Sequence, residues 1–146
     1  MEKQIIVVDI DGTLADISHR QHHIKGKRKK WQKFFQAMDK DLPVPAIAAK
    51  VRMLSQDHTI VLVSGRPDDY RRLTEDWLKR HKIPYHQLFM RQSGDFRDDD
   101  VVKQEILNQH LNKDKIKLVI DDRPRVIRMW RKNGLQVEDV GEGVEF

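Results

Sequence analysis

A run of four β-branched residues, residues 5–8, leads directly into Asp9 and Asp11, and Gly12 follows them. Such a run suits a strand that is buried on both faces, which is typical of a parallel sheet. Because side chains alternate along a strand, we expect the two carboxylates to lie on one side where the strand ends. Gly12 allows the backbone to turn sharply beside a ligand. This feature predicts an α/β fold with an acidic site at the end of its first strand.

Similar apolar runs recur along the chain and leave room for helices between them. They predict strands at residues 4–10, 59–63, 87–90, 117–120 and 135–140. The segments between them carry apolar residues at helical spacing, in four stripes: Ile47, Val51 and Leu54; Tyr70, Leu73 and Trp77; Val102, Ile106 and His110; Val126 and Trp130. Strands that alternate with helices predict a Rossmann-like three-layer α/β sandwich with a mostly parallel central sheet.

The composition is that of one folded domain. With 146 residues we expect a single domain over residues 1–146. The absence of cysteine excludes disulfides and thiolate metal sites and favours a cytoplasmic location. No apolar run is long enough for a membrane span, so no membrane partner is expected. The formal net charge of +5 allows a polyanionic partner without requiring one.

One basic segment, residues 19–33, interrupts the regular alternation with histidines followed by lysines and an arginine. Residues 14–42, which contain it, are predicted to form a small flap or cap after the first strand. Two interpretations stay open: a solvated surface loop, or a flap whose lysines hold a phosphodiester backbone. Trp31, Phe34 and Phe35 fit the core of a small helix better than a platform for base stacking.

Polar residues follow three of the predicted strands. In an open parallel sheet, ligands bind beyond the carboxyl ends of the strands. The residues at these ends are Asp9 and Asp11 on the first strand, Ser64, Gly65 and Arg66 on the second, and Asp121, Asp122 and Arg123 on the fourth. If these strands are neighbours, four carboxylates, a hydroxyl group and two guanidinium groups converge at one edge of the sheet.

The acidic residues predict both a cation site and a nucleophile. Carboxylates without histidine or cysteine favour a hard divalent cation, most simply Mg²⁺. Asp9 and Asp121 are the expected direct ligands, and Asp122 is expected to bind through a metal-bound water. A carboxylate can also attack phosphorus, and we assign that role to Asp9. Asp11 is expected to protonate the leaving alkoxide and then to deprotonate the attacking water, which requires a raised pKa.

A phosphoryl group in transfer needs hydrogen-bond donors and cations around it. Ser64 and the backbone amides near Gly65 are predicted to donate hydrogen bonds, and Lys103 is predicted to supply a positive charge. Lys103 follows three aspartates at residues 98–100, which we interpret as negative charge at the start of a helix.

The ordered motifs resemble those of the haloacid dehalogenase superfamily. The resemblance is carried, in chain order, by residues 9–14, Ser64, Lys103, Asp121 and Asp122. It implies a phosphatase with Mg²⁺ as cofactor and with the roles given above. It further implies a phosphate contact for Thr13 and the main-chain carbonyl of Asp11 as an additional Mg²⁺ ligand.

A longer match is to the 3′-phosphatase domains of bacteriophage polynucleotide kinase/phosphatases. Residues 91–103 and 120–131 are similar to the corresponding segments of those domains. Arg20 and residues 63–66 align with their substrate-binding and phosphate-binding positions, and Arg123 is assigned to the same group. The resemblance implies removal of 3′-phosphate from nucleic acid.

A kinase domain is not expected, because Gly26 and Lys27 are followed by Arg28 and no phosphate-binding kinase motif is present. The leading hypothesis is a Mg²⁺-dependent phosphomonoesterase of nucleic acid repair, which removes 3′-phosphate from DNA or RNA ends through an aspartyl-phosphate. One alternative is a phosphatase of free nucleotides or other small phosphate esters. An alternative of another class is a noncatalytic nucleic-acid-binding module on the same scaffold.

Overall fold

The centre of the fold is a five-stranded sheet. The structure, a computed structural model, describes residues 3–143. The strands lie in the order β5-β4-β1-β6-β7, and every pairing is parallel. Their bounds are β1 Ile5–Val8, β4 Thr59–Pro67, β5 Gln87–Arg91, β6 Ile116–Asp121 and β7 Val137–Asp139. The predicted parallel sheet is confirmed.

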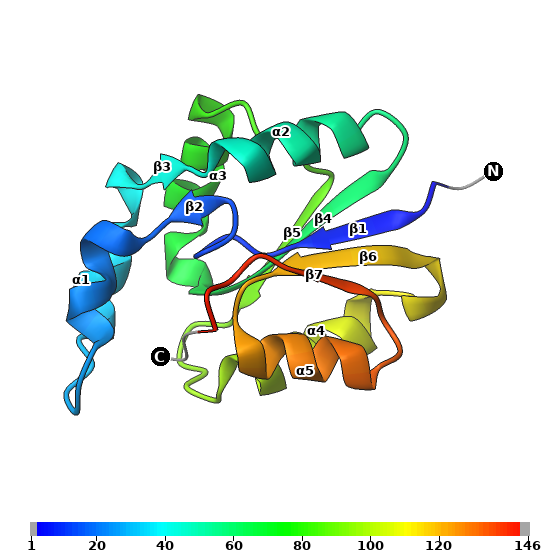
Figure 1. Cartoon of the computed structure of the whole chain (residues 1–146). Helices are drawn as coiled ribbons and strands as arrows, with labels where there is room; N and C mark the ends of the chain where they lie inside the picture. The colour runs from blue at the N-terminus through cyan, green and yellow to red at the C-terminus, as the bar shows by residue number, and fades with distance from the viewer. Residues whose placement is uncertain (1–2, 144–146) are drawn as a thin grey trace.

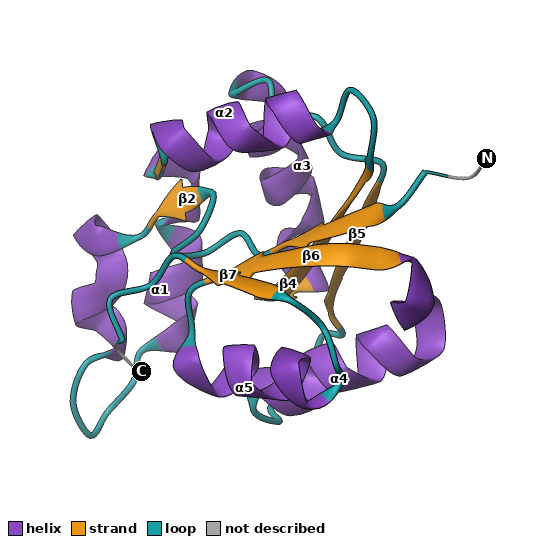
Figure 2. Cartoon of the chain, turned by 45° about the vertical axis from the view of Figure 1, so that its right-hand side comes forward, coloured by secondary structure: helices purple, strands orange, loops and turns teal. Residues whose placement is uncertain are grey.

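Two pairs of helices cover the two faces of this sheet (Figures 1 and 2). One pair is α2 (Pro45–Leu54) and α3 (Arg71–Arg80), and the other is α4 (Asp99–His110) and α5 (Pro124–Lys132). The predicted Rossmann-like three-layer α/β sandwich is therefore confirmed. Within residues 3–143, every helix is too short or too polar to cross a membrane.

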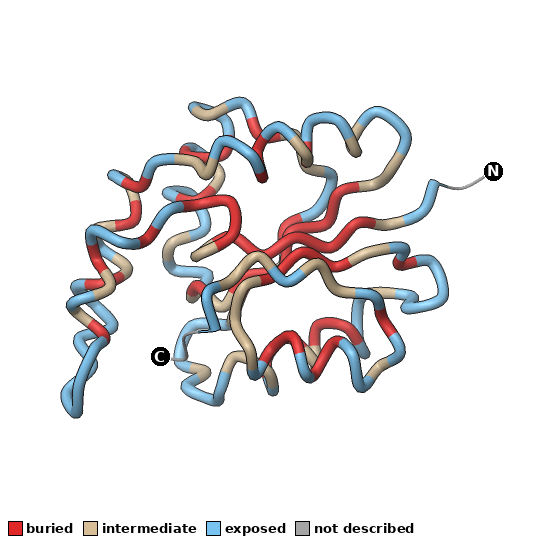
Figure 3. Tube along the Cα trace, in the orientation of Figure 1, coloured by how far each residue is buried: buried red, intermediate tan, exposed pale blue. Residues whose placement is uncertain are grey.

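Alternation along the strands divides the core between the two faces of the sheet. Ile6 and Val8 pack with residues of α2 and α3, whereas Val7 packs with residues of α4 and α5. All three side chains are at most 1% exposed, and Figure 3 shows the buried stretch running through the middle of the sheet. Burial on both faces explains why this strand is a continuous apolar run.

The strand ends differ from the predicted ones where the site begins. β1 ends at Val8 rather than Ile10, because the backbone turns there: the amides of Thr13 and Ala15 donate to the carbonyl of Ile10 at 3.1 and 2.9 Å. β4 instead continues beyond its predicted end at Val63. The polar residues that follow Val63 are therefore held in strand geometry.

Two predicted helix stripes are wrong in part: His110, at the end of the stripe on α4, is exposed, and the stripe of Tyr70, Leu73 and Trp77 differs more. Tyr70 precedes α3 in a 3-10 helix, η3 (Asp68–Tyr70), and Leu73 is 38% exposed. The residues that α3 buries are Thr74, Trp77 and Leu78. The buried face is therefore rotated relative to the predicted stripe, because Thr74 turns inward to accept a hydrogen bond from Arg66.

The segment between β1 and α2 forms a small substructure, which we call the flap. It consists of β2 (Ala15–Asp16), the 3-10 helix η1 (Ser18–Ile24), α1 (Trp31–Gln36), the 3-10 helix η2 (Met38–Lys40) and β3 (Leu42–Pro43). β2 and β3 pair antiparallel at its base, and Ile17, Ile24 and Phe34 form a small core of its own. In Figure 1, α1 lies beyond the carboxyl ends of the sheet strands.

Candidate active site

Three carboxylates meet where β1 and β6 end. The two strands are neighbours, and the amide of Asp9 donates to the carbonyl of Ile120 at 3.0 Å. Asp121 is the last residue of β6, and Asp122 follows it. Asp9, Asp121 and Asp122 each offer a carboxylate oxygen, and these oxygens lie within 4.8 Å of one another. The adjacency of β1 and β6 thus brings the two acidic motifs together.

Lys103 lies between two of these carboxylates. Its Nζ donates to Asp9 Oδ1 at 2.8 Å and to Asp121 Oδ2 at 3.1 Å. The indole Nε1 of Trp130 donates to the same Asp121 oxygen at 3.1 Å. Burial opposes the charge on Lys103, but Asp121 and Asp9 outweigh it and raise the pKa of the ammonium group well above its usual range. Lys103 is therefore a fixed positive charge at the centre of the site.

One ammonium group does not balance three carboxylates. Burial and the nearby Asp121 raise the pKa of Asp9 well above its usual range, although Lys103 acts in the opposite direction. Burial also raises the pKa of Asp122 to about 6, with a further contribution from Asp121. Carboxylates that resist ionisation in this way gain from a bound cation, because added positive charge favours their ionised form.

Gly12 and Thr13 shape the turn that carries the acidic residues. The Thr13 hydroxyl lies 3.2 Å from Asp9 Oδ2 and 3.1 Å from Asp122 Oδ1, so its single proton can serve either carboxylate. Gly12 has φ of +82°, and a Cβ there would lie 2.1 Å from Asp122 Oδ2. Glycine is therefore required both for the turn and for the close approach of Asp122. The structure shows Thr13 as a partner of the acidic cluster.

Asp11 points away from this cluster toward two arginines. Its Oδ1 accepts hydrogen bonds from Arg20 Nη2 at 2.7 Å and from Arg66 Nη2 and Nε at 2.6 and 3.0 Å. Burial acts to raise its pKa, but the guanidinium groups of Arg66 and Arg20 hold the pKa of Asp11 well below its usual range. The expected raised pKa is therefore wrong for this arrangement, in which Asp11 is an anion.

Arg20 and Arg66, which were predicted to bind substrate or phosphate, are buried beside Asp11. Both side chains are 0% exposed, so they have no surface to offer a substrate in this structure. Arg20 donates to both carboxylate oxygens of Asp41 at 2.8 and 2.6 Å and to the carbonyl of Phe34 at 3.1 Å. The two arginines hold Asp11, and Arg20 ties it to the flap.

Ser64 and Gly65 occupy the end of β4 beside the site. Ser64 is 1% exposed, and its Oγ accepts a hydrogen bond of 3.1 Å from the amide of Arg66. Gly65 lines a cavity that also contacts Asp9 and Lys103. A Cβ on Gly65 would lie 2.3 Å from Asp99 Oδ1, so glycine is needed for the approach of that carboxylate.

Asp99 and Arg91 are site residues that sequence reasoning missed. Asp99 accepts from Arg123 Nη1 at 2.6 Å and from Arg91, whose Nε donates to the carbonyl of Gly65 at 2.8 Å. Burial raises the pKa of Asp99, but Lys103, Arg123 and Arg91 together hold it below its usual value. The available signal was that Asp99 lies four residues before Lys103, which places both on one helix face. Arg123, predicted to bind phosphate, thus pairs with Asp99.

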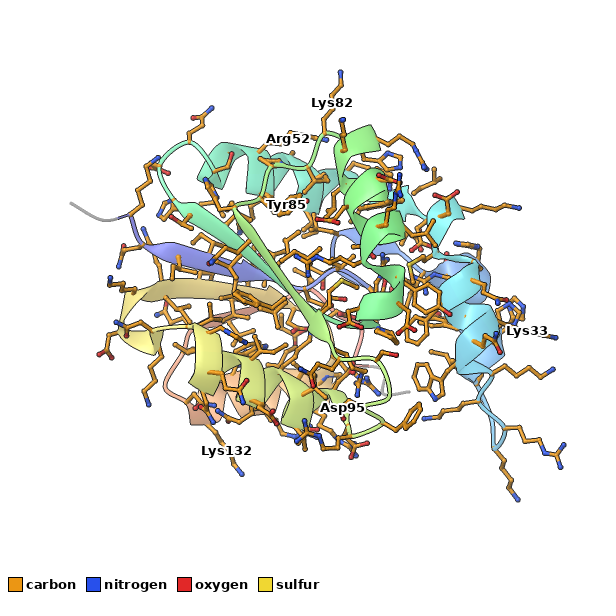
Figure 4. All side chains as sticks on the ribbon, turned by 180° about the vertical axis from the view of Figure 1, so that it is seen from behind. Lys33, Arg52, Lys82, Tyr85, Asp95 and Lys132 are labelled. Carbon is orange, nitrogen blue, oxygen red and sulfur yellow. The ribbon has the colours of Figure 1, made fainter. Side chains whose placement is uncertain are left out.

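A cavity of about 620 Å³ opens above the acidic residues. Its floor includes the buried residues Asp9, Asp121 and Lys103, and residues of the flap and of the loop between β5 and α4 also line it. In Figure 4, Asp95 lies on that loop, below the end of β5, and Lys33 lies on α1 at the right-hand edge of the molecule. A volume of this order accommodates an organic ligand as well as a phosphate group.

The donor set fits a magnesium ion. Asp9, Asp121 and Asp122 offer only oxygen atoms as ligands, which Mg²⁺ prefers. The pKa values of Asp9 and Asp122 are raised in this cluster, so a bound cation would favour their ionised forms. The Asp11 side chain is held by arginines instead, so the main-chain carbonyl implied by the resemblance is the group that Asp11 has left to offer. Three of the four predicted metal ligands thus meet through their carboxylates, and the contribution of Asp11 through its main-chain carbonyl stays a prediction.

The fold and the arrangement of Asp9, Lys103 and the Asp121–Asp122 pair define a haloacid dehalogenase-type phosphatase. Comparison with known proteins narrows this class. Residues 3–145 match the family described as the polynucleotide kinase PNKP phosphatase domain. The chain belongs to this family and is a phosphoric monoester hydrolase.

Individual relatives agree with this assignment. The chain is 28% identical to a protein in the structure of the Pnkp1/Rnl/Hen1 RNA repair complex, with a TM-score of 0.83 over 98% of this chain and 44% of that one. It is 30% identical over 128 residues to a bifunctional polynucleotide kinase/RNA ligase of Autographa californica nuclear polyhedrosis virus, covering 86% of this chain and 17% of the relative. The chain thus spans less than half the length of both relatives.

A more distant structure supports the fold alone. A haloacid dehalogenase-like hydrolase from Streptococcus pneumoniae is 15% identical to this chain, with a TM-score of 0.65. The similarity covers 92% of this chain and 83% of the other. The three-layer architecture is therefore shared well beyond the sequence motifs.

Proposed function

We propose that this phosphatase removes 3′-phosphate from the ends of DNA or RNA through an aspartyl-phosphate on Asp9. The observation that carries the proposal is the hydrogen bond of 2.8 Å from Lys103 to Asp9 beside Asp121 and Asp122. Asp9, the proposed nucleophile, and the positively charged Lys103 both line a cavity wide enough for a nucleotide, which supports this role. Membership of the family of polynucleotide kinase phosphatase domains favours nucleic acid as the substrate.

The first step is attack of an Asp9 carboxylate oxygen on phosphorus. A bond forms between this oxygen and phosphorus, the ester bond to the 3′-oxygen breaks, and the leaving oxygen takes a proton. Bound Mg²⁺ supplies positive charge to the phosphate and to the carboxylates that hold the ion. Lys103 orients Asp9 and stabilises negative charge near the phosphate. Water then attacks the aspartyl-phosphate, releasing inorganic phosphate and restoring Asp9.

Asp11 remains the proposed proton carrier. Of its two predicted tasks, protonating the leaving alkoxide and deprotonating the attacking water, its ionised state fits the second directly. As an anion it can accept a proton from the attacking water in the second step. To donate a proton in the first step it must bind one, which requires the guanidinium groups of Arg20 and Arg66 to hold it less tightly. We therefore propose that both arginines are positioning residues for Asp11 rather than substrate ligands.

Phosphate-release assays with a set of substrates test this function. We expect Mg²⁺-dependent release from 3′-phosphorylated DNA or RNA oligonucleotides to exceed release from mononucleotide 3′- and 5′-phosphates. A preference that weakens with added salt would implicate the basic flap in holding the strand. Faster release from mononucleotides would instead favour the alternative of a small phosphate ester, and no release from any oligonucleotide would overturn the proposal.

The Asp9→Asn variant tests the chemistry. It should abolish turnover while the circular dichroism spectrum stays that of the parent, because only one oxygen is replaced. Asp57→Asn is the matched control, since that side chain is 78% exposed and lies outside the site. The alternative of a noncatalytic binding module finds no support, because the site contains all four charged groups: Asp9, Lys103, Asp121 and Asp122. A cytoplasmic location stays a prediction.

A further inference from the structure

Two exposed aromatic rings, from two different segments, line the cavity. Trp31, on the flap helix α1, is 39% exposed, and Phe96, on the loop between β5 and α4, is 94% exposed. Both residues line the cavity whose floor contains Asp9. Single exposed apolar residues are common on protein surfaces. Two large exposed rings from two different segments, lining one cavity above the proposed catalytic residues, are a more specific arrangement.

Trp31 is held in place without being covered. Its ring stacks on Phe35 with centroids 5.9 Å apart and planes at 23°, and it meets Phe34 edge to face at 5.7 Å. The ammonium of Lys29 lies 5.7 Å from the Trp31 ring centroid. The ring is thus fixed by the small flap core, keeps exposed surface and has a cation beside it. A preformed surface of this kind loses little entropy when a planar ligand stacks on it.

The loop that carries Phe96 is fixed by the site itself. Arg91 Nη1 donates to the carbonyls of Asp95 and Arg97 at 3.1 and 2.5 Å, on either side of Phe96. The same Arg91 side chain donates to the carbonyl of Gly65 at 2.8 Å and pairs with Asp99. One arginine therefore connects the backbone around Phe96 to the catalytic end of β4. This loop presents an almost fully exposed ring from an ordered backbone.

The surroundings of the two rings suit a polyanionic strand with unpaired bases. Three cationic side chains line the same cavity: Lys29, together with Arg97, which pairs with Asp95 and Glu105, and Arg125, which pairs with Asp98. Nucleic acid strands bind to surfaces that combine positive charge with aromatic rings, because each base offers a flat face for stacking. The phosphate of such a strand has to reach Asp9 on the floor, which leaves its last bases at the level of the rings.

We propose that Trp31 and Phe96 are stacking surfaces for the bases at an unpaired 3′ end, and that they distinguish a polynucleotide end from a small phosphate ester. The proposal rests on the proposed function and assigns its substrate selectivity to two named residues. The sequence alone favoured a core role for Trp31, whereas the structure leaves this residue partly exposed in the lining of the cavity. Loss of one stacked base is expected to weaken binding by roughly 5- to 100-fold.

A binding experiment separates stacking from catalysis. In the Asp9→Asn variant, and in the parent chain without divalent cation, we would compare two single-stranded 3′-phosphorylated oligonucleotides. One oligonucleotide carries a base on every nucleotide, and the other has the same backbone but no base on its last two nucleotides. The base-containing strand should bind at least about fivefold more tightly. The ratio of the two dissociation constants measures this preference. Trp31→Ala and Phe96→Ala should each reduce the ratio, while Trp31→Phe and Phe96→Tyr should preserve most of it.

Leu42→Ala serves as the control, because Leu42 is 70% exposed on the flap and carries no aromatic ring. Its ratio should equal that of the parent. A ratio near one in the parent, or a ratio that survives both alanine substitutions, would overturn the stacking proposal. If the ratio behaves as expected but the parent releases no 3′-phosphate with Mg²⁺, the proposed function fails while the stacking surfaces stand.

Discussion

The ammonium group of Lys103 lies 2.8 Å from Asp9 Oδ1, although both side chains are almost completely buried. Lys103 comes from α4 and Asp9 from the end of β1, so this contact joins two layers of the sandwich at the site. A buried charge is tolerated only with a partner, because burial removes its hydration. The pair is consequently a structural requirement as well as part of the proposed catalytic site.

Lys103→Met should therefore affect both activity and stability. The variant removes a positive charge beside Asp9, the proposed nucleophile, and we expect turnover to fall by about 10²-fold or more. Without Mg²⁺ it should also be destabilised by about 3–5 kcal/mol, because Asp9 and Asp121 lose their buried partner. Thermal unfolding with and without Mg²⁺ checks this: the cation should restore part of the lost stability. Equal losses in both conditions would show that the cation does not share this cluster with Lys103.

Mg²⁺ binding should weaken as pH falls through about 6, the pKa of Asp122. Below that pH the cation must displace a proton, and each further pH unit should lower the affinity by up to about tenfold. Because burial raises this pKa above that of the unfolded chain, the unfolded state binds fewer protons between about pH 4 and 6. Stability of the cation-free protein should therefore decrease as pH rises through this window.

Isothermal titration with Mg²⁺ at pH values from 5 to 8 measures this effect directly. Asp122→Asn is the informative comparison, since it should bind Mg²⁺ more weakly and lose the pH dependence near 6. Trp130 fluorescence offers a second readout, because its indole donates to Asp121 within the cluster. An affinity that is the same across this range in the parent would contradict the raised pKa.

Asp11→Asn should cost more stability near neutral pH than at low pH. Arg66 and Arg20 lower the pKa of Asp11 against the effect of burial, so the carboxylate stabilises the fold above its ordinary pKa of about 4. This contribution is lost as pH falls toward the lowered pKa. We expect the variant to be destabilised by about 3–5 kcal/mol at pH 7, because a buried arginine loses a partner.

Denaturant unfolding of parent and variant at pH 7 and at pH 3 tests this prediction. The difference between the two proteins should narrow at the lower pH. Asp39→Asn is the control, since Asp39 pairs with Arg80 at the surface, where such pairs contribute little. A destabilisation of Asp11→Asn that stays constant down to pH 3 would mean that charge is not its cause.

Much of the acidic site followed from the sequence because it depends only on strand ends. A parallel sheet places the residues after adjacent strands at one edge, so Asp9 and the Asp121–Asp122 pair could be expected to meet once their strands were recognised. The position of Lys103 could be predicted from one further condition, that the helix carrying it begins near the same edge of the sheet. These positions are fixed by periodicity and topology, which a sequence expresses directly.

The environment of Asp11 could not be predicted in the same way. Strand alternation would place Asp11 beside Asp9, but β1 ends at Val8 and the turn after it directs Asp11 toward Arg20 and Arg66. Arg20 comes from a 3-10 segment without helical or strand periodicity, so nothing in the pattern indicated its direction. The exposure of Phe96 likewise depends on loop geometry that local residue types do not specify.

Gly12→Ala should impair the site more than the fold, and Gly26→Ala separates the two effects. Both glycines have positive φ, +82° and +90°, so alanine should cost each about 1 kcal/mol of stability. A Cβ at Gly26 would meet no atom within 4 Å, whereas at Gly12 it would lie 2.1 Å from Asp122 Oδ2. Gly12→Ala should therefore lower turnover by at least about tenfold, because it displaces Asp122 from the proposed Mg²⁺ site, while Gly26→Ala retains the parent's rate. Phosphate-release kinetics and thermal unfolding of both variants decide the matter: equal rates would show that Asp122 can move aside without consequence for catalysis.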